Sequence, residues 1–268
     1  MNRQFILILV CTLFSSVIFS QERSKPFTWP DGKKVAVSLS FDDARLSQVD
    51  AGIPVLDSLG VKATFYLNPV PMRERLEGWK KAVAAGHEIG NHSMTHPCSG
   101  NYSWVEKGNE LENFTMDKMR KNLLECSKIL KDELGVTTTL FAYPCGQKYI
   151  GRGKNLKSYV PLIAEMFASG RGWFEEMNNA PMFCDYAQLA GREMDGKTFE
   201  QIQVLINGAM EHGEWLLLAG HEMGEEGTQT VRISMLRKLI EYAKDPANGV
   251  WLAPVGEVQD YIKKQRGN

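Results

Sequence analysis

The sequence has no excess of charge of either sign, since its 268 residues carry 31 lysines and arginines against 32 aspartates and glutamates. A formal net charge of −1 gives no electrostatic reason to expect a nucleic acid or an anionic membrane as a partner. The sequence also lacks internal repeats, low-complexity tracts and long linkers. We therefore expect one globular domain of enzyme size that acts on small or neutral molecules, with no stable protein partner implied.

Cysteine is scarce and never occurs as a Cys-X-X-Cys pair, which argues against a cysteine-rich zinc site. Cys11 falls in the apolar N-terminal run, which leaves Cys98, Cys126, Cys145 and Cys184. In an exported protein these four allow three connectivities if all of them pair. A domain of this length can bury enough apolar surface without disulfides, so free buried thiols are the alternative.

The first twenty residues, MNRQFILILVCTLFSSVIFS, differ from the rest of the chain. Arg3 stands near the start, an apolar run extends from residue 5 to residue 13, and small residues come toward Ser20. The pattern predicts a secretory signal peptide over residues 1–20, because the apolar run is too short for a membrane span. We expect cleavage after Ser20, a catalytic domain over residues 21–268 and a secreted or periplasmic location; an uncleaved anchor is the alternative.

Short β-rich runs alternate with amphipathic helical patterns through the rest of the chain. This alternation predicts a largely parallel sheet in a single α/β domain, and the pattern alone leaves a barrel and an open sheet as alternatives. The strands are expected at 35–41, 62–67, 87–91, 138–142, 215–219 and 249–253, with a weaker candidate at 171–174, and helices at 116–135, 199–213, 230–244 and 257–264.

Polar residues gather directly after four of the predicted strands. In an α/β barrel the catalytic groups lie at the carboxyl ends of the strands, so these side chains are candidates for one common site. The residues that follow the strands are Asp42 and Asp43, His92 and His96, the turn at 143–146, and His221.

His92 and His96 stand four residues apart, and Pro97 follows directly. Two imidazoles at this spacing can lie on one face of a helical turn and chelate a divalent metal. Because Pro97 prevents a helix from continuing, we expect one rigid helical turn at the strand end. The pair alone is a weak signal, since two of the five histidines can share this spacing by chance.

The adjacent carboxylates of Asp42 and Asp43 strengthen the metal hypothesis. They repel each other and need a cation nearby, although a solvated turn or a helix N-cap is the alternative. A catalytic zinc site takes three nitrogen or oxygen ligands, and Asp43, His92 and His96 form such a set. Side chains alternate along a strand, so Asp42 should point elsewhere and could act as the general base.

Two further groups complete the parts that metal-assisted acyl hydrolysis requires. His221 could donate a proton to the leaving group, because a histidine can hold a proton near neutral pH. Backbone N–H groups in the turn at 144–146 could stabilise a developing oxyanion.

Four segments in this order, SFDDA (40–44), HSMTHP (92–97), FAYPCG (141–146) and LLLAGH (216–221), resemble the motifs of the polysaccharide deacetylases. These proteins form the NodB-homology domain of carbohydrate esterase family 4. The resemblance implies a distorted (β/α) barrel of about seven parallel strands, a divalent metal (zinc before cobalt or nickel), and removal of acetyl groups from a carbohydrate. By position it implies Asp42 as the catalytic base, Asp43, His92 and His96 as metal ligands, the backbone N–H of Cys145 as oxyanion donor, and His221 as the catalytic acid.

Two positions depart from the family's pattern. Ala142 stands where the family commonly has an arginine that tethers the base, and Gly172-Trp173 stands where it commonly has Asp-Trp. Loss of these charged neighbours would shift the pKa values of Asp42 and His221. Residues that could compensate are Arg171, Arg192, Glu175 and Glu176.

Several residues, most of them aromatic, are candidates for substrate contact. Tyr143, Pro144 and Trp173 are expected at the substrate, with Trp173 as an apolar wall beside the acetyl group or, alternatively, as ordinary core packing. Tyr102 and Trp104 lie in a polar loop after the histidine pair and could stack on sugar rings; a packed loop is the alternative.

We favour a secreted, metal-dependent N- or O-deacetylase of a poly- or oligosaccharide. One alternative is a related amidohydrolase of a small non-sugar amide, for which a narrow closed pocket would argue. The other is an inactive carbohydrate-binding relative, which the missing arginine favours and the complete set of catalytic residues opposes. Chitin fragments, peptidoglycan, acetylated xylan and other acetylated glycans all remain open as substrates.

Overall fold

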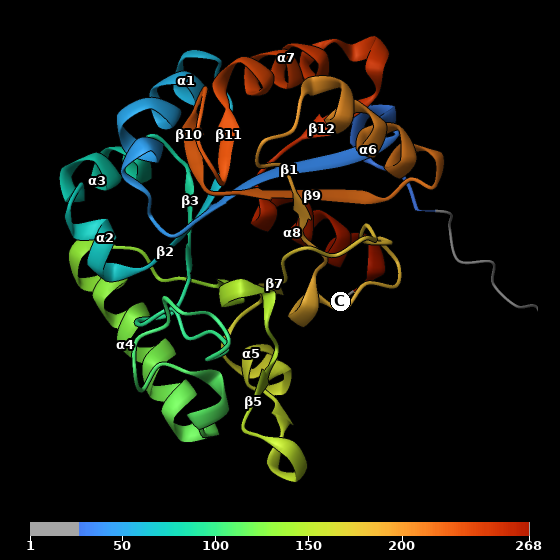
Figure 1. Ribbon diagram of the computed structural model, residues 1–268. Helices are drawn as coiled ribbons and strands as arrows, with labels where there is room; N and C mark the ends of the chain where they lie inside the picture. Colours follow the sequence, from blue (N-terminus) through green and yellow to red (C-terminus); the bar gives the residue numbers. More distant parts are fainter. Residues whose placement is uncertain (1–26, 268) are drawn as a thin grey trace, which may run out of the picture.

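The structure, a computed structural model, describes residues 27–267, so the predicted signal peptide lies outside the described residues. Its main sheet places seven parallel strands in the order β7-β4-β3-β2-β1-β9-β8, and an eighth strand, β12, pairs with β1 (Figure 1). These strands are β1 (Val35–Asp42), β2 (Thr64–Leu67), β3 (Glu88–Asn91), β4 (Leu140–Ala142), β7 (Ser169–Arg171), β8 (Arg192–Glu193), β9 (Trp215–Gly220) and β12 (Val250–Leu252).

The strand β1 is the centre of the sheet. All eight of its residues are buried, as expected for a parallel strand that is covered on both faces. Along one edge it pairs with β9 over residues 36–41. Along the other edge it pairs first with β12, over residues 35–37, and then with β2, over residues 40–42.

The sheet closes through the segment 189–194, which bonds to β7 at its start and to β9 at its end. The N–H of Leu189 donates to the carbonyl of Gly170 at 2.8 Å, and the N–H of Gly172 donates back to Leu189 at 2.8 Å. Farther along, the N–H of Met194 donates to the carbonyl of Ala219 at 2.9 Å. This ring of parallel strands confirms the predicted distorted (β/α) barrel.

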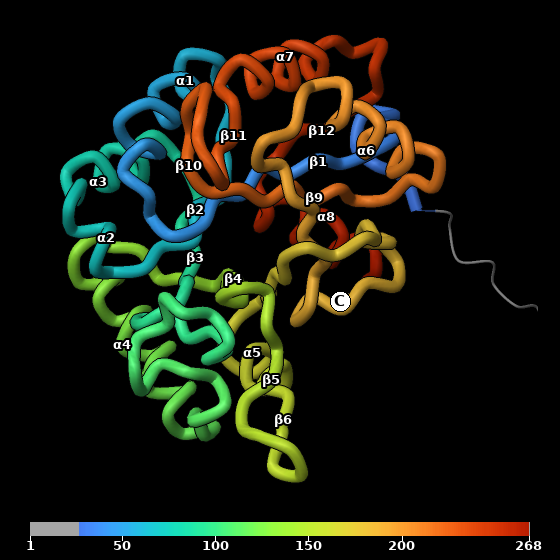
Figure 2. Tube along the Cα trace, viewed as in Figure 1, coloured from blue at the N-terminus to red at the C-terminus, as the bar shows by residue number. Residues whose placement is uncertain are grey.

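Helices surround the ring (Figures 1 and 2), and their buried apolar side chains pack with those of the strands in three clusters. In the described part of the chain, no helix is long and apolar enough to cross a membrane. The helices are α1 (Ile53–Ser58), α2 (Pro69–Arg73), α3 (Leu76–Ala84), α4 (Met116–Leu134), α5 (Val160–Met166), α6 (Phe199–Glu211), α7 (Ile233–Lys244) and α8 (Val255–Arg266).

The helix boundaries follow local capping signals. The side chain of Thr115 accepts a hydrogen bond from the N–H of Lys118 at the start of α4, and Gly135 ends that helix with a left-handed φ of 74°. Thr198 and Gln201 form a capping box at the start of α6. The four predicted helices correspond to α4, α6, α7 and α8, although α7 begins at Ile233 rather than at residue 230.

Three smaller features differ from the predicted boundaries. The weaker strand candidate at 171–174 was wrong for all but Arg171, because β7 ends there and the chain turns away. The start of the helix predicted at 230–244 is instead β11 (Thr230–Arg232), which pairs with β10 (Glu222–Gly224). A separate hairpin of β5 (Tyr149–Ile150) and β6 (Lys157–Ser158) projects from the body of the molecule (Figure 2).

Candidate active site

The polar residues that follow the strands meet at one cavity of about 820 Å³. Because the strands of the main sheet are parallel, their carboxyl ends lie at the same edge, as in other α/β barrels. Gln48 fixes two of these ends together, since its buried amide donates to the carbonyls of Asp42 and, at 2.8 Å, His221. The predicted site residues that line the cavity are Asp42, Asp43, His92, His96, Tyr143, Cys145, Trp173 and His221.

Asp43, His92 and His96 form the predicted cluster of ligand atoms. One carboxylate oxygen of Asp43, Oδ1, lies 3.3 Å from Nε2 of His92 and 3.3 Å from Nε2 of His96. This oxygen is buried and has no hydrogen-bond partner among residues 27–267. This oxygen and the two imidazole nitrogens that face it form a set of three ligand atoms that fits a divalent cation.

The hydrogen bonds behind the rings favour the same interpretation. Nδ1 of His92 lies 2.9 Å from the carbonyl oxygen of Ala142. A carbonyl can only accept, so Nδ1 carries the hydrogen and Nε2 of the neutral ring keeps its lone pair toward Asp43. The other oxygen of Asp43, Oδ2, accepts two hydrogen bonds from Arg45, at 2.9 and 3.2 Å.

The loop that carries the histidines is not the helical turn that the sequence predicted. Ser93 and His96 have left-handed φ angles of 68° and 47°. The side chain of Asn91 accepts from the N–H of Ser93 at 2.7 Å, and the hydroxyl of Ser93 accepts from the N–H of His96 at 3.0 Å. These side-chain bonds replace the backbone bonds of a helix, and the two rings still meet, with centroids 4.9 Å apart.

The cluster holds its ionisable groups in the states that bind cations. Burial alone would raise the pKa of Asp43, but the close approach of His92 and the neighbouring imidazoles of His96 and His221 outweigh burial and hold that pKa far below its usual range. Burial, with the neighbouring His92, lowers the pKa of His96 from 6.5 to about 4. Asp43 is therefore ionised and His96 neutral throughout the physiological range.

The positively charged partner of Asp42 is Arg171, whereas the family commonly places an arginine at the position of Ala142. The guanidinium of Arg171 is fully buried and forms an ion pair with Oδ1 of Asp42. It also donates to the carbonyl of Gly172 at 2.8 Å and lies 5.0 Å from the ring centroid of Tyr66. Arg171 pairs with Ala142 across β7 and β4, so the charge comes from the neighbouring strand.

The other three residues that could have compensated for the missing arginine contact other groups. Arg192 donates to the backbone carbonyl of Glu176. Glu175 pairs with Lys148 at 2.6 Å and accepts from the N–H of Gly191 at 2.9 Å. Of the four residues, Arg171 alone contacts Asp42 within the described chain.

His221 has a carboxylate partner that the sequence did not reveal. Oδ2 of Asp195 lies 2.7 Å from Nδ1 of His221, and its Oδ1 accepts from the N–H of His221 at 3.0 Å. Burial would lower the pKa of His221, but this hydrogen bond and the charges of Asp42, Asp43 and Asp195 raise it above 6.5. Asp195 follows the two-residue strand β8, which is too short to produce a β pattern, so it was missed.

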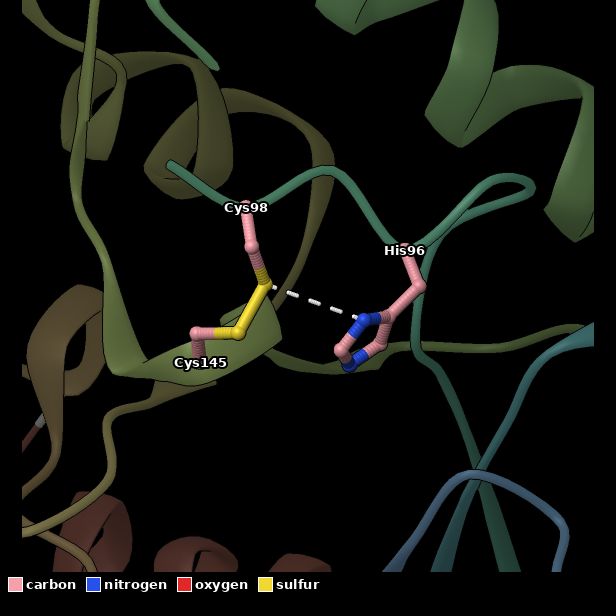
Figure 3. Close-up of side chains that lie close together, drawn as sticks. All are labelled: His96, Cys98 and Cys145. Carbon is pink, nitrogen blue, oxygen red and sulfur yellow. Dashed lines mark hydrogen bonds between the residues drawn. A yellow bond between two sulfur atoms is a disulfide. The ribbon is translucent and has the colours of Figure 1, made fainter. Parts of the chain in front are cut away.

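Cys145 occupies a strained turn beside the cluster. It has a left-handed φ of 54°, and its backbone N–H has no hydrogen-bond partner within the part of the chain described. A free N–H at the cavity suits the predicted role of oxyanion donor. The Cys145 side chain forms a disulfide with Cys98, whereas Cys126 and Cys184 are free thiols (Figure 3). One pairing and two thiols thus replace the alternatives left open by the sequence.

The three residues predicted to contact substrate differ in position. Trp173 lies against His221, with ring centroids 4.7 Å apart and at 78° to each other. Tyr143 lines the cavity, but it is buried and its hydroxyl donates to the carbonyl of Ala187 at 2.7 Å. Pro144 is buried and does not line the cavity, so the structure does not bring it to the site; it shapes the turn instead.

Tyr102 and Trp104 stand at the rim of the cavity, in the loop after the histidines. Their side chains are 44% and 56% exposed, and the two rings are stacked with centroids 5.2 Å apart. The ring of Trp104 lies 5.9 Å from that of His96. They form an exposed aromatic surface next to the cluster rather than a packed loop.

The chain is similar to known proteins in its sequence and its fold. Residues 30–166, just over half of the chain, match the family model described as polysaccharide deacetylase. A protein of Bacillus subtilis (strain 168), "Putative polysaccharide deacetylase YheN", is 32% identical over 112 residues, which cover 42% of this chain and 36% of the relative. The chain spans about a third of the length of the first curated relatives that it matches.

Solved structures share the fold at low sequence identity. A "putative polysaccharide deacetylase from Mycobacterium smegmatis" has a TM-score of 0.67 and 19% identity, with 90% of this chain and 94% of that chain covered. A family 4 acetyl xylan esterase from Clostridium thermocellum, in complex with a cobalt ion, has a TM-score of 0.55 and 18% identity, with coverages of 84% and 91%. Since the family model matches more than half of the sequence, the chain belongs to the polysaccharide deacetylase family.

Proposed function

We propose that this protein is a metal-dependent carbohydrate deacetylase, which hydrolyses N- or O-acetyl groups of a poly- or oligosaccharide. The observation that carries the proposal is the buried Oδ1 atom of Asp43, which accepts no hydrogen bond from the described residues and lies between the Nε2 atoms of His92 and His96. It lies in the same cavity as Asp42 and His221. Asp42 forms an ion pair with the buried Arg171, and His221 contacts the buried carboxylate of Asp195.

Asp43, His92 and His96 would hold the divalent cation. A cation in this position would polarise the acetyl carbonyl and lower the pKa of the attacking water. We propose zinc, with cobalt or nickel as alternatives, because a site of two imidazoles and one carboxylate accepts several divalent ions. The cobalt ion in the acetyl xylan esterase structure supports a metal of this class.

Asp42 is the proposed general base. Its ion pair with Arg171 keeps one carboxylate oxygen occupied and fixes the plane of the group, which orients it toward the cavity. In the proposed reaction Asp42 accepts the proton of the attacking water as the carbon–oxygen bond to the acetyl carbon forms.

His221 is the proposed general acid. Its Nδ1 is engaged by Asp195, so Nε2 is the atom that would give a proton to the leaving nitrogen or oxygen of the sugar. The free N–H of Cys145 would donate to the carbonyl oxygen as negative charge develops on it. Trp173 supports the ring of His221 from one side.

The cavity suits a carbohydrate better than a small amide. It has a volume of about 820 Å³, and its rim carries the exposed rings of Tyr102, Trp104 and Phe174. Flat exposed aromatic rings present apolar faces and polar edges, which match the mixed surface of a sugar ring. These residues do not form the narrow closed pocket that would argue for a small non-sugar amide.

We also propose that the protein is exported, as the N-terminal pattern predicts. The disulfide between Cys98 and Cys145 supports this proposal, because disulfides persist in oxidising compartments such as the periplasm and the extracellular space.

The first test is acetate release by the purified protein. The panel contains acetylated chitooligosaccharides, acetylated xylan, peptidoglycan and an aryl acetate, each with added Zn²⁺ and with a chelator. We expect chelator-sensitive release from one of the carbohydrates. Release that a chelator leaves unchanged would contradict the metal mechanism, and no release with cation bound would favour the inactive carbohydrate-binding alternative.

A further inference from the structure

The loops after β3 and β4 carry His96 and Cys145, yet the two strands barely support each other. They pair through a single register position, Asn91 with Phe141, whereas β1 and β9 pair over six positions. Hydrogen bonds of the sheet therefore restrain the relative position of these two loops only weakly. Beyond the sheet, Nδ1 of His92 donates to the carbonyl of Ala142 at the end of β4 at 2.9 Å, and the remaining restraint comes from contacts between the loops themselves.

Both loops also contain backbone conformations that need external support. His96 and Cys145 have left-handed φ angles of 47° and 54°, which residues other than glycine adopt only when their surroundings impose them. Two hydrogen bonds join the segments that follow β3 and β4 directly, from the N–H of Ser99 to the side chain of Gln147 at 2.7 Å and from the N–H of Gly151 to the carbonyl of Leu111 at 3.0 Å. The covalent link between the loops is the disulfide of Cys98 and Cys145.

The disulfide touches the back of a proposed metal ligand (Figure 3). Sγ of Cys98 lies 3.7 Å from Nδ1 of His96, on the opposite side of the ring from Nε2, which faces Asp43. His92 has a backbone carbonyl in the equivalent place, behind its own Nδ1. The sulfur thus takes the position from which partners of ligating histidines set the ring orientation.

We propose that the Cys98–Cys145 disulfide positions the active site by coupling the His96 ring to the Cys145 turn, and that a dithiol opens it and reversibly lowers cation affinity and turnover. The inference rests on the proposed metal-dependent function. It adds a positioning role for two cysteines and a redox dependence that the metal cluster alone does not require.

The exposure of the two cysteines decides which sulfur atom of the disulfide a dithiol attacks. Cys98 is fully buried, whereas Cys145 is half-buried and lines the cavity, so an incoming thiolate attacks Sγ of Cys145. The sulfur of Cys98 leaves as a thiolate beside His96, and a mixed disulfide forms at Cys145. The second thiol of the reagent resolves it, which leaves two cysteine thiols and the cyclic disulfide of the reagent.

The test compares the oxidised protein with protein that has been reduced by dithiothreitol and freed of reagent by gel filtration. Binding of Co²⁺ is titrated by its absorption, and hydrolysis of an aryl acetate gives kcat and KM at a temperature at which circular dichroism shows both forms to be folded. We expect cation affinity and kcat to fall by about 10- to 100-fold on reduction, the range typical of lost ligand-orienting contacts, and to return on reoxidation.

The double variant Cys98→Ser/Cys145→Ser should match the reduced protein and gain no further sensitivity to dithiothreitol. The double variant also controls for residual dithiothreitol, because chelation of Co²⁺ by the reagent would affect the wild-type protein and the variant equally. The variant Cys184→Ser is the matched control, because this free thiol lies outside the cavity. Unchanged Co²⁺ affinity and kcat after reduction, with only a lower melting temperature, would overturn the inference. An oxidised protein that binds no Co²⁺ would instead overturn the proposed function.

Discussion

Arg171 lies directly across from Ala142 where β7 pairs with β4, and its buried guanidinium forms the ion pair with Asp42. Family members commonly carry an arginine at the position of Ala142. Here the same charge reaches the same carboxylate from the paired residue of the neighbouring strand. The departure that argued for an inactive relative is therefore a relocation of the charge, and it leaves the proposed base with its cation.

The first prediction concerns this relocated charge. Arg171→Ala should lower kcat by about 10- to 100-fold, because Asp42 loses the group that orients it. It should also destabilise the fold by about 3–5 kcal/mol, since removing one partner of a buried ion pair leaves the other charge buried alone. Steady-state kinetics and urea unfolding measure the two effects.

Arg192→Ala is the control for Arg171→Ala, because Arg192 binds a backbone carbonyl and not Asp42. The double variant Arg171→Ala/Ala142→Arg should recover part of the lost kcat by returning the charge to the family's usual strand. Full activity in Arg171→Ala alone would show that the ion pair has no part in catalysis.

The second prediction separates cation binding from proton transfer. Asp43→Ala and His92→Ala should abolish retention of Zn²⁺, because each removes one of three proposed ligands. Asp42→Asn should retain Zn²⁺ and lose turnover by about 100-fold or more, the contribution of a general base. Elemental analysis and kinetics of the same protein samples make the comparison. An active Asp42→Asn variant would refute the assignment of the base.

The third prediction follows from the raised pKa of His221. If protonated His221 is the acid, activity is retained below that pKa and lost as the pH rises through it. Asp195→Asn removes the negative charge and replaces the hydrogen bond to a carboxylate with a weaker one to a neutral amide, so less opposes the lowering of the pKa by burial. The alkaline limb of kcat should therefore move to lower pH in this variant. His221→Ala should lose the limb and most of the turnover but retain Zn²⁺. An alkaline limb that stays in place in Asp195→Asn would exclude this role for Asp195.

The sequence predicts the parts of the site that lie at the ends of long strands. β1 and β9 are long, buried and mostly apolar, so the polar residues at their carboxyl ends, Asp42, Asp43 and His221, stand out by contrast. The alternation of strands and helices also predicts the parallel sheet, and with it the common edge, but not the order of the strands. These are local properties that a strand displays in its own residues.

The parts that the sequence did not predict depend on pairing between distant segments. Asp195 follows a two-residue strand, so no periodic signal marks it. Arg171 ends a strand of three, so the sequence could name it only as one of four candidates. The disulfide joins residues that are 47 positions apart, and nothing in their local sequences selects this pairing over the others. The helical turn at His92–His96 was wrong because side chains of Asn91 and Ser93, rather than the backbone, take the loop's hydrogen bonds.

The last prediction tests whether the aromatic rim binds sugar. Trp104 is 56% exposed and lies 5.9 Å from the ring of His96, close enough to contact a sugar unit next to the one being deacetylated. Trp104→Ala should raise KM for an acetylated oligosaccharide by about tenfold, the loss of one aromatic contact of roughly 1 kcal/mol or more. It should leave kcat/KM for an aryl acetate nearly unchanged, because that substrate has no neighbouring sugar. Tyr149, which is also 56% exposed but lies on the β5–β6 hairpin outside this cavity, provides the control variant Tyr149→Ala. Equal losses on both substrates would mean that Trp104 supports the loop of His96 and does not bind carbohydrate.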